Sequence, residues 1–267
     1  MENSKTQIIA TIGPISSVEE TLGLMIEKRL DVARLNFSWG DLTLKKGTID
    51  LIRKLSKTHN RQIPIIADMP GPRIQKESGH TFDHDSIRAI TETDKEYIKF
   101  AVEQDIEYIA VSFVSSAKDI LECRELIKNL SGTQKIIAKI ERKEALENLE
   151  EIINISDAVM VARGDLGEAI PIEELPFVQQ KIIKLAKASN KPVIVATQMM
   201  FSMVENDTPT RAEVTDVEVA VLEGADAVML SEETAMGKHP IETVAMMERL
   251  ILEAEKHLEP TAIFNHL

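Results

Sequence analysis

Eight short apolar runs, each followed by a segment with helical periodicity, constrain the fold of this chain more than any other feature. The runs are rich in Val, Ile and Ala without two-residue alternation, which is typical of strands buried on both faces of a parallel sheet. We place the strands at 7–13, 32–36, 63–68, 108–112, 135–140, 158–162, 192–197 and 227–230. The helices are predicted at 17–29, 41–58, 94–104, 116–129, 143–154, 173–189, 209–223 and 240–256, with Thr93 and Thr208 as start signals of two of them.

Eight successive strand–helix units with right-handed crossovers predict a closed (β/α)8 TIM barrel, an α/β fold. The chain has 267 residues, close to the roughly 250 typical of such barrels, so we expect one domain over residues 1–267. A doubly wound open sheet is the alternative. Residues 69–93 form a connection longer than an ordinary βα loop, which we interpret as an active-site loop or lid. Beyond the β/α alternation, the sequence shows no internal repeat.

Composition excludes several classes of protein. The formal net charge of −13 argues against nucleic acid as a partner, because phosphate groups require a basic surface. Cys123 is the only cysteine, so an intramolecular disulfide cannot form and a reducing compartment is expected. No apolar run approaches the roughly 18 residues of a membrane-spanning helix. We therefore predict a cytoplasmic protein without a membrane partner.

Charged residues follow the fifth and sixth predicted strands, where a barrel of this type would have its active site. Lys139 and Glu141 end the fifth strand, and Arg163 and Asp165 follow the sixth. Two carboxylates and a lysine at one rim suit a divalent metal ion that holds an anionic, oxygen-rich substrate. Together with Arg34 at the end of the second strand, Lys139, Glu141 and Asp165 are the predicted site residues.

Ten motifs in order carry a resemblance to a known family. They are IIATIGP (8–14), VARLNFSWG (32–40), ADMPGPRI (67–74), TETDKEYIKFAVEQ (91–104), VSFV (111–114), AKIE (138–141), MVARGDLG (160–167), KPVIVATQMM (191–200), TPTRAEVTDV (208–217) and AVMLSEETAMGKHP (227–240). In this order they resemble the barrel domain of pyruvate kinase. The resemblance implies a barrel without the lid domain that the family inserts after the third strand, and without its C-terminal domain.

The resemblance implies roles for several rim residues. Glu141 and Asp165 correspond to the ligands of a divalent cation, Mg²⁺ or Mn²⁺. Lys139 corresponds to the catalytic lysine, which would stabilise charge on the transferring phosphoryl group and on the enolate oxygen. Thr197 corresponds to the threonine that helps a water molecule protonate the enolate, and Arg34 to an arginine that faces the phosphate.

Substrate contacts are implied in the same way. The substrate carboxylate would lie against the backbone N–H groups of a turn formed by Ala162, Arg163, Gly164 and Asp165. The family's second active-site arginine is replaced by Gln75, and Arg73, two residues earlier, is the candidate to take its place.

A monovalent cation site is also implied. Asn36, Ser38 and Asp68 match three positions that hold K⁺ in the family, whereas the fourth, usually threonine, is Met69. K⁺ is thus an expected cofactor beside Mg²⁺, with an incomplete set of ligands.

Three functions follow from these observations. The first is a minimal kinase that transfers phosphate between phosphoenolpyruvate and a nucleoside diphosphate, with ADP and ATP as nucleotide partners. The second is a metal-dependent lyase, decarboxylase or tautomerase that acts through the enolate of a pyruvate-like 2-oxo acid without a nucleotide. The third is a non-catalytic barrel with a binding or regulatory role, since a fold alone does not guarantee activity. An oligomer is compatible with all three.

Overall fold

The computed structural model describes residues 4–76, 79–82, 88–258 and 264–267. Eight parallel strands form a closed barrel in which strands consecutive along the chain are neighbours and the last strand pairs with the first. The barrel strands are β1 (Gln7–Thr11), β2 (Val32–Asn36), β3 (Ile65–Asp68), β6 (Tyr108–Val111), β7 (Lys135–Ile140), β8 (Ala158–Ala162), β9 (Val193–Ala196) and β10 (Ala227–Leu230). The predicted barrel is confirmed, and the open sheet is excluded.

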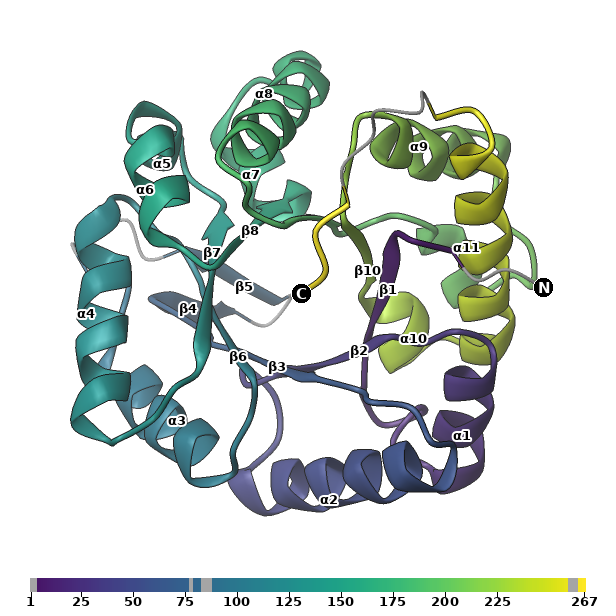
Figure 1. Cartoon of the computed structure of the whole chain (residues 1–267), viewed down its shortest axis with the longest axis horizontal. Helices are drawn as coiled ribbons and strands as arrows, with labels where there is room; N and C mark the ends of the chain where they lie inside the picture. Colours follow the sequence, from purple (N-terminus) through teal and green to yellow (C-terminus); the bar gives the residue numbers. More distant parts are fainter. Residues whose placement is uncertain (1–3, 77–78, 83–87, 259–263) are drawn as a thin grey trace.

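Helices surround the ring of strands (Figure 1). They are α1 (Glu19–Glu27), α2 (Leu42–Thr58), α3 (Glu92–Glu103), α4 (Ala117–Asn129), α5 (Lys143–Glu147), α6 (Leu149–Ile155), α7 (Arg163–Ala169), α8 (Leu175–Ala188), α9 (Arg211–Leu222), α10 (Glu232–Ala235) and α11 (Pro240–Glu255), with 3₁₀ turns η1 (Ile172–Glu174) and η2 (Phe201–Val204). In the described part of the chain, no helix is both long and apolar enough to cross a membrane.

Three local predictions differ from the structure. The helix expected at 143–154 is interrupted at Asn148, whose side-chain amide donates to the Ser115 carbonyl at 2.9 Å. The N-caps of α3 and α9 are Thr91 and Thr210 rather than Thr93 and Thr208. Each forms a capping box with the acidic residue three positions later, which satisfies two N–H groups at once.

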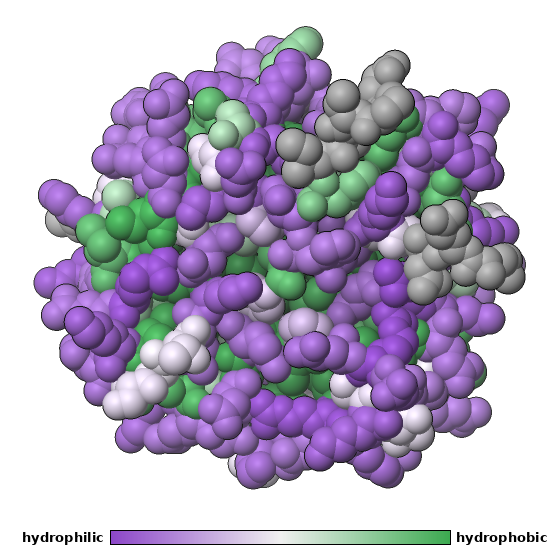
Figure 2. Space-filling model, viewed as in Figure 1, coloured by the Kyte–Doolittle hydropathy of each residue, from purple (hydrophilic) through white to green (hydrophobic). Residues whose placement is uncertain are grey.

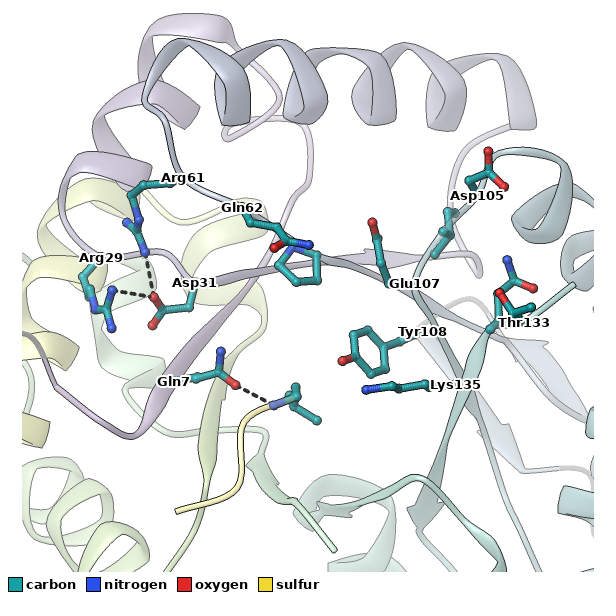
Figure 3. Close-up of a pocket in the computed structure, with 14 residues that line it drawn as sticks. Gln7, Arg29, Asp31, Arg61, Gln62, Asp105, Glu107, Tyr108, Thr133 and Lys135 are labelled. Carbon is teal, nitrogen blue, oxygen red and sulfur yellow. Dashed lines mark hydrogen bonds and ion pairs between the residues drawn. The ribbon is translucent and has the colours of Figure 1, made fainter.

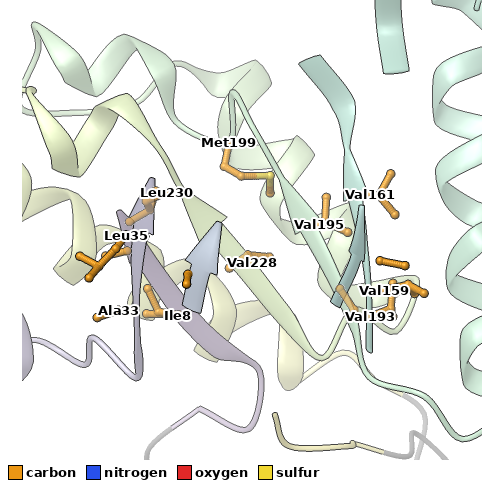
Figure 4. Packing of buried hydrophobic residues seen from close by; sticks show 14 of the residues in the cluster. Ile8, Ala33, Leu35, Val159, Val161, Val193, Val195, Met199, Val228 and Leu230 are labelled. Atoms are coloured by element: carbon orange, nitrogen blue, oxygen red, sulfur yellow. The ribbon is translucent and has the colours of Figure 1, made fainter. Parts of the chain in front are cut away.

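Buried side chains form two clusters because the strands are covered on both faces. Ile8, Leu35 and Val159 belong to the cluster between the strands and the helices (Figure 4). Their neighbours along the strands, such as Ile9 and Met160, belong to the cluster inside the barrel. Since successive side chains of a strand point to opposite faces, every second residue faces the barrel interior. This alternation also decides which residues reach the rim of the barrel.

The connection between β3 and α3 contains a hairpin of β4 (Arg73–Lys76) and β5 (Gly79–Phe82). Its remaining residues 77–78 and 83–87 lie outside the described residues. The connection leaves the rim through Gly71, which has a φ of 66°, a conformation that favours glycine. A Cβ atom at this position would meet the Ser112 Cβ at 3.0 Å, so the chain passes too close to the rim for a larger residue.

The amino-terminal end of the barrel contains a repeat that the sequence analysis missed. An acidic residue precedes every second strand and accepts a hydrogen bond from a backbone N–H of the strand before it. The pairs are Asp31 with Ile8 at 2.9 Å, Glu107 with Ile65 at 2.8 Å, Asp157 with Ile136 at 2.8 Å and Asp226 with Val193 at 3.0 Å. The four carboxylates thereby join β1 to β2, β3 to β6, β7 to β8 and β9 to β10. The barrel is thus built from four pairs of strands.

Candidate active site at the carboxyl-terminal rim

Inward-facing positions of the strands continue past the interior cluster and become polar at the rim. Ile66 and Ile137 lie in the interior, and Asp68 and Lys139 follow two residues later on the same face. Ala110 is followed in the same way by Ser112. The alternation of the strands therefore brings polar side chains from several strands to one place at the end of the barrel.

Lys139 lies at the centre of this site and is only 3% exposed. Its Nζ lies 3.0 Å from Asp68 Oδ1 and 2.9 Å from Glu141 Oε1, and it donates a hydrogen bond of 2.7 Å to Ser112 Oγ. The Ser112 hydroxyl in turn donates to the Met69 carbonyl at 2.7 Å. A buried ammonium group needs such partners, because an unpaired charge away from water is costly. The lysine is thus held in one position.

Arg34 is the second cation of the site. Its Nε donates to Asp68 Oδ2 at 2.7 Å and its Nη1 donates to Thr11 Oγ1 at 2.8 Å. Burial alone would raise the pKa of Asp68, but Lys139, Arg34 and Arg73 together lower it to about 2. Asp68 therefore stays ionised and holds the two neighbouring cations in place.

Glu141 has one satisfied and one unsatisfied oxygen. Its Oε2 accepts a hydrogen bond of 2.6 Å from the backbone N–H of Phe113. Its Oε1 is buried near Lys139, yet no donor among the described residues is aligned for a hydrogen bond to it. Burial raises the pKa of Glu141, Lys139 lowers it, and Asp165 raises it further, with a net upward shift. A buried carboxylate whose pKa is raised is a group that a further cation would stabilise in its ionised form.

Arg73 connects the two predicted metal ligands. Its Nη2 lies 4.0 Å from Glu141 Oε1 and 3.6 Å from Asp165 Oδ2, and its guanidinium lies over the Phe113 ring. Both carboxylates thus face the same positive group. Mg²⁺ prefers one or two carboxylates together with water and substrate oxygens, so these two residues fit a divalent ion. Within the described residues, no group of three or more His, Cys, Asp or Glu side chains could hold a metal alone.

The predicted monovalent cation site does not fit K⁺ in the same way. Each oxygen of Asp68 already contacts a cation of the chain, Arg34 or Lys139. The Asn36 Oδ1 accepts the backbone N–H of Ser38 at 3.0 Å. The side chain of Met69 is buried and offers only a thioether sulfur, a poor ligand for a hard cation, and the Met69 carbonyl already accepts the Ser112 hydroxyl at 2.7 Å. Arg34 and Lys139 thus already neutralise the Asp68 carboxylate that would otherwise attract K⁺.

Thr197 and the start of α7 form the other side of the rim. Helix α7 begins directly after β8, where a loop was expected, and the Gly164 N–H donates to Thr197 Oγ1 at 2.8 Å. The Thr197 hydroxyl donates to the Ala196 carbonyl at 2.6 Å. The side chain of Arg163 points away from Asp165 and donates to Asp216 Oδ1 at 2.6 Å. Of Arg163, only the backbone is thus positioned to contact a substrate.

The structure brings most of the predicted residues together and adds others. Arg34, Asp68, Lys139, Glu141, Arg73 and Asp165 form a chain of contacts shorter than or equal to 4.0 Å. The side chain of Gln75 lies outside what the structure describes. The sequence analysis missed Thr11 and Phe113, which hold Arg34 and Glu141. The buried Glu233 also lies near the end of its strand and accepts the Ser231 N–H at 2.7 Å. Inward alternation from Ile9 would have identified Thr11.

The opposite end of the barrel has a cavity of about 740 Å³ that contains none of the predicted site residues (Figure 3). The starts of the strands line it, and the main-chain N–H of Leu267 donates to Gln7 Oε1 there. Arg29 and Arg61 both contact the same oxygen of Asp31. The arginines of this end are thus paired within the protein. Figure 2, in the view of Figure 1, shows mainly hydrophilic residues at the surface.

Comparisons with known proteins agree with the geometry. Residues 3–87 and 83–244 match the family model described as pyruvate kinase, barrel domain. A pyruvate kinase of Thermococcus litoralis is 35% identical, with 97% of this chain and 71% of that protein covered. The corresponding values are 36%, 95% and 72% for a pyruvate kinase of Thermotoga maritima, and 35%, 96% and 58% for one of Sporosarcina psychrophila.

The alignments also contain a long internal gap. The match to the Thermococcus litoralis protein runs over 339 positions, whereas this chain has 267 residues. The relative therefore carries residues without a counterpart here. The two parts of the family match meet at 83–87, within the connection between β3 and α3.

Proposed function

Because this chain belongs to the pyruvate kinase family, we propose that it catalyses phosphoryl transfer between phosphoenolpyruvate and a nucleoside diphosphate, giving pyruvate. The observation that carries the proposal is the buried Lys139, held by Asp68, Glu141 and Ser112 at the catalytic end of the barrel. A buried lysine that is paired with two carboxylates seldom adds net stability, so a role in catalysis is a reason for its presence. We also propose the cytoplasm as its compartment.

The cations of the rim would act on the phosphate and the enolate oxygen. Lys139 and Arg34 are both fixed by Asp68, so little reorganisation is needed when charge develops on the substrate. Arg73 supplies a third positive group beside them. Glu141 and Asp165 would hold Mg²⁺ or Mn²⁺, which when bound supplies further neutralisation of the substrate's oxygens. These groups together serve the part of the reaction that forms and stabilises the enolate.

The remaining rim residues would orient the substrate and direct a proton. The backbone N–H groups of residues 162–165 would bind the carboxylate of phosphoenolpyruvate, with the Gly164 N–H exchanging the Thr197 hydroxyl for the substrate. The Thr197 hydroxyl, close to Gly164, would orient the water that gives a proton to the enolate carbon. The carbon–hydrogen bond formed in this step yields the methyl group of pyruvate.

The internal gap gives a second candidate function its support. Relatives have additional residues where this chain has only the β4–β5 hairpin and its flanks, so the nucleotide side of the site would be less enclosed. Exclusion of water and fixed positioning contribute much of the rate in phosphoryl transfer. The alternative is therefore a lyase, decarboxylase or tautomerase that uses the same enolate chemistry on a pyruvate-like 2-oxo acid without a nucleotide.

Two assays distinguish these functions. Pyruvate formation from phosphoenolpyruvate, ADP and Mg²⁺ is followed at high enzyme concentration, with Lys139→Met as the control. We expect activity above this control, and equal rates would refute the kinase. In parallel, Mg²⁺-dependent exchange of pyruvate methyl protons in D₂O is followed by NMR without nucleotide. Exchange without phosphoryl transfer would establish the second function in place of the first.

A further inference from the structure

We propose that Arg163 is a positioning residue, which holds the Thr197 turn in the geometry that protonation of the enolate requires. The inference rests on the proposed function and assigns its side chain a role different from the backbone contact expected from the sequence. It acts through Thr197 and does not itself contact the substrate.

The guanidinium of Arg163 joins three elements. Arg163 is the first residue of α7, and its side chain is 11% exposed. Nη2 donates to the Thr197 carbonyl at 2.7 Å and to Met199 Sδ at 2.9 Å, on the segment after β9. Nη1 donates to Asp216 Oδ1 at 2.6 Å, on α9. The planar guanidinium, with donors pointing in fixed directions, can serve both sides at once, which a lysine cannot do.

The segment that Arg163 holds has an unfavourable backbone conformation. Thr197 has a φ of 73° and Gln198 a φ of 52°, both in the left-handed region. For a β-branched residue such as threonine this conformation is rare and unfavourable. It persists only where surrounding contacts enforce it. The hydrogen bonds from Arg163 to the Thr197 carbonyl and from Gly164 to its hydroxyl are such contacts.

Asp216 fixes the orientation of the Arg163 guanidinium. Its side chain is 35% exposed and comes from α9, not from a strand of the barrel. Gln179 accepts a longer contact of 3.5 Å from Arg163 Nη1 and donates to Glu223 at 2.9 Å. Without Asp216, Arg163 would keep its contacts to the Thr197 segment but lose the charged partner on α9. Asp216→Asn is therefore a milder test of the same arrangement.

The test combines three variants with a Thr197→Val background. Arg163→Gln, Arg163→Lys and Asp216→Asn are made alone and with Thr197→Val, and melting temperature reports folding. We expect Arg163→Gln to slow pyruvate methyl exchange about tenfold to a hundredfold, in line with the cost of misplacing a reacting group. Arg163→Lys should be nearly as slow in methyl exchange as Arg163→Gln, and Asp216→Asn should slow the exchange less than either. In the Thr197→Val background, Arg163→Gln should change the rate by less than about twofold, because its target is already gone.

A second readout does not depend on activity. Amide hydrogen exchange of residues 196–199 is expected to rise in Arg163→Gln and, to a smaller extent, in Asp216→Asn, while other strands keep their protection. Unchanged protection, or an equal loss of methyl exchange in the Thr197→Val background, would overturn the inference. If the wild-type protein shows no methyl exchange, the enolate chemistry of the proposed function fails, and amide exchange still decides whether Arg163 holds the turn.

Discussion

The two ends of the barrel use carboxylates in different ways. At the amino-terminal end, Asp31, Glu107, Asp157 and Asp226 each accept a backbone N–H and join neighbouring strands. At the carboxyl-terminal end, Asp68 contacts side-chain cations on both oxygens, and Glu141 keeps one buried oxygen without a hydrogen bond. The first set holds the strands together, whereas the second holds side-chain cations in fixed positions at the rim.

The pKa of Asp68 is shifted in the opposite direction to those of Asp31 and Asp226, whereas the pKa of Glu141, beside Asp68, is raised like theirs. Burial raises the pKa of Asp31 and of Asp226, and their hydrogen bonds and cationic neighbours only partly offset it. At the other end, burial is outweighed by three cations, and the pKa of Asp68 falls to about 2. Charge at the amino-terminal end is therefore incidental to the hydrogen bonds. At the carboxyl-terminal end, charge is what the arrangement maintains.

The largest expected effect separates activity from stability at the rim. Glu141→Gln removes a proposed metal ligand, and we expect catalysis to fall about a thousandfold, since a bound metal contributes several kcal/mol to such reactions. The free energy of unfolding without Mg²⁺ should stay unchanged or rise, because burial raises the pKa of Glu141, so that its ionised form is disfavoured in the folded protein and a neutral amide removes this cost. Urea unfolding and the pyruvate assay measure the two effects. A large loss of stability would show that Glu141 is structural.

The second largest effect is expected at the amino-terminal end, where a substitution should lower stability and leave activity in place. Asp31→Ala leaves Arg29, Arg61 and the Ile8 N–H without their shared partner, which should cost about 3 kcal/mol of unfolding free energy. Activity at 25 °C should remain, since this end lies opposite the proposed active site. Asp50→Ala is the control, because Asp50 pairs with Lys46 at the surface and such pairs contribute little. Loss of activity in folded Asp31→Ala would contradict the division between the ends.

The contributions of Asp68 and Asp226 to stability, one at each end of the barrel, should change with pH in opposite directions. A carboxyl with a lowered pKa, such as Asp68, stabilises the fold above its unfolded pKa and loses this contribution as the pH falls toward the folded value. The stability difference between the wild type and Asp68→Asn should thus shrink between about pH 4 and pH 2, by on the order of 2 kcal/mol.

For Asp226, whose pKa is raised, the contribution is present at low pH and is lost as the pH rises through the folded value. The difference between the wild type and Asp226→Asn should therefore shrink toward neutral pH. Urea unfolding of the wild type and both variants between about pH 2 and pH 7 compares them. A shift in the same direction at both ends would remove the distinction between them.

Much of this architecture could be predicted from the sequence because strands buried on both faces leave an unmistakable apolar pattern. Lys139 and Glu141 could be predicted because they directly end such a run. The direction of the Arg163 side chain could not, since it depends on α7 beginning immediately after β8 and on Asp216, 53 residues later. The acidic repeat was missed because each member is one residue before a strand, where a single charge has no periodicity to reveal it.

The smallest expected effect concerns the monovalent cation. Family resemblance suggests K⁺, yet Arg34 and Lys139 already contact both oxygens of Asp68, and the side chain of Met69 offers no oxygen. We therefore expect replacement of K⁺ by tetramethylammonium at constant ionic strength to change the rate by less than about twofold, since the charge is supplied by the chain.

Melting temperature in the same two salts is the second measurement, and it should not distinguish them. Met69→Thr is the matched variant, because it restores an oxygen at the fourth position. If the wild-type rate collapses without K⁺, then an external ion reaches Asp68 in spite of its two partners. The carboxyl-terminal end would in that case bind K⁺, and Arg34 and Lys139 would have to share Asp68 with this ion.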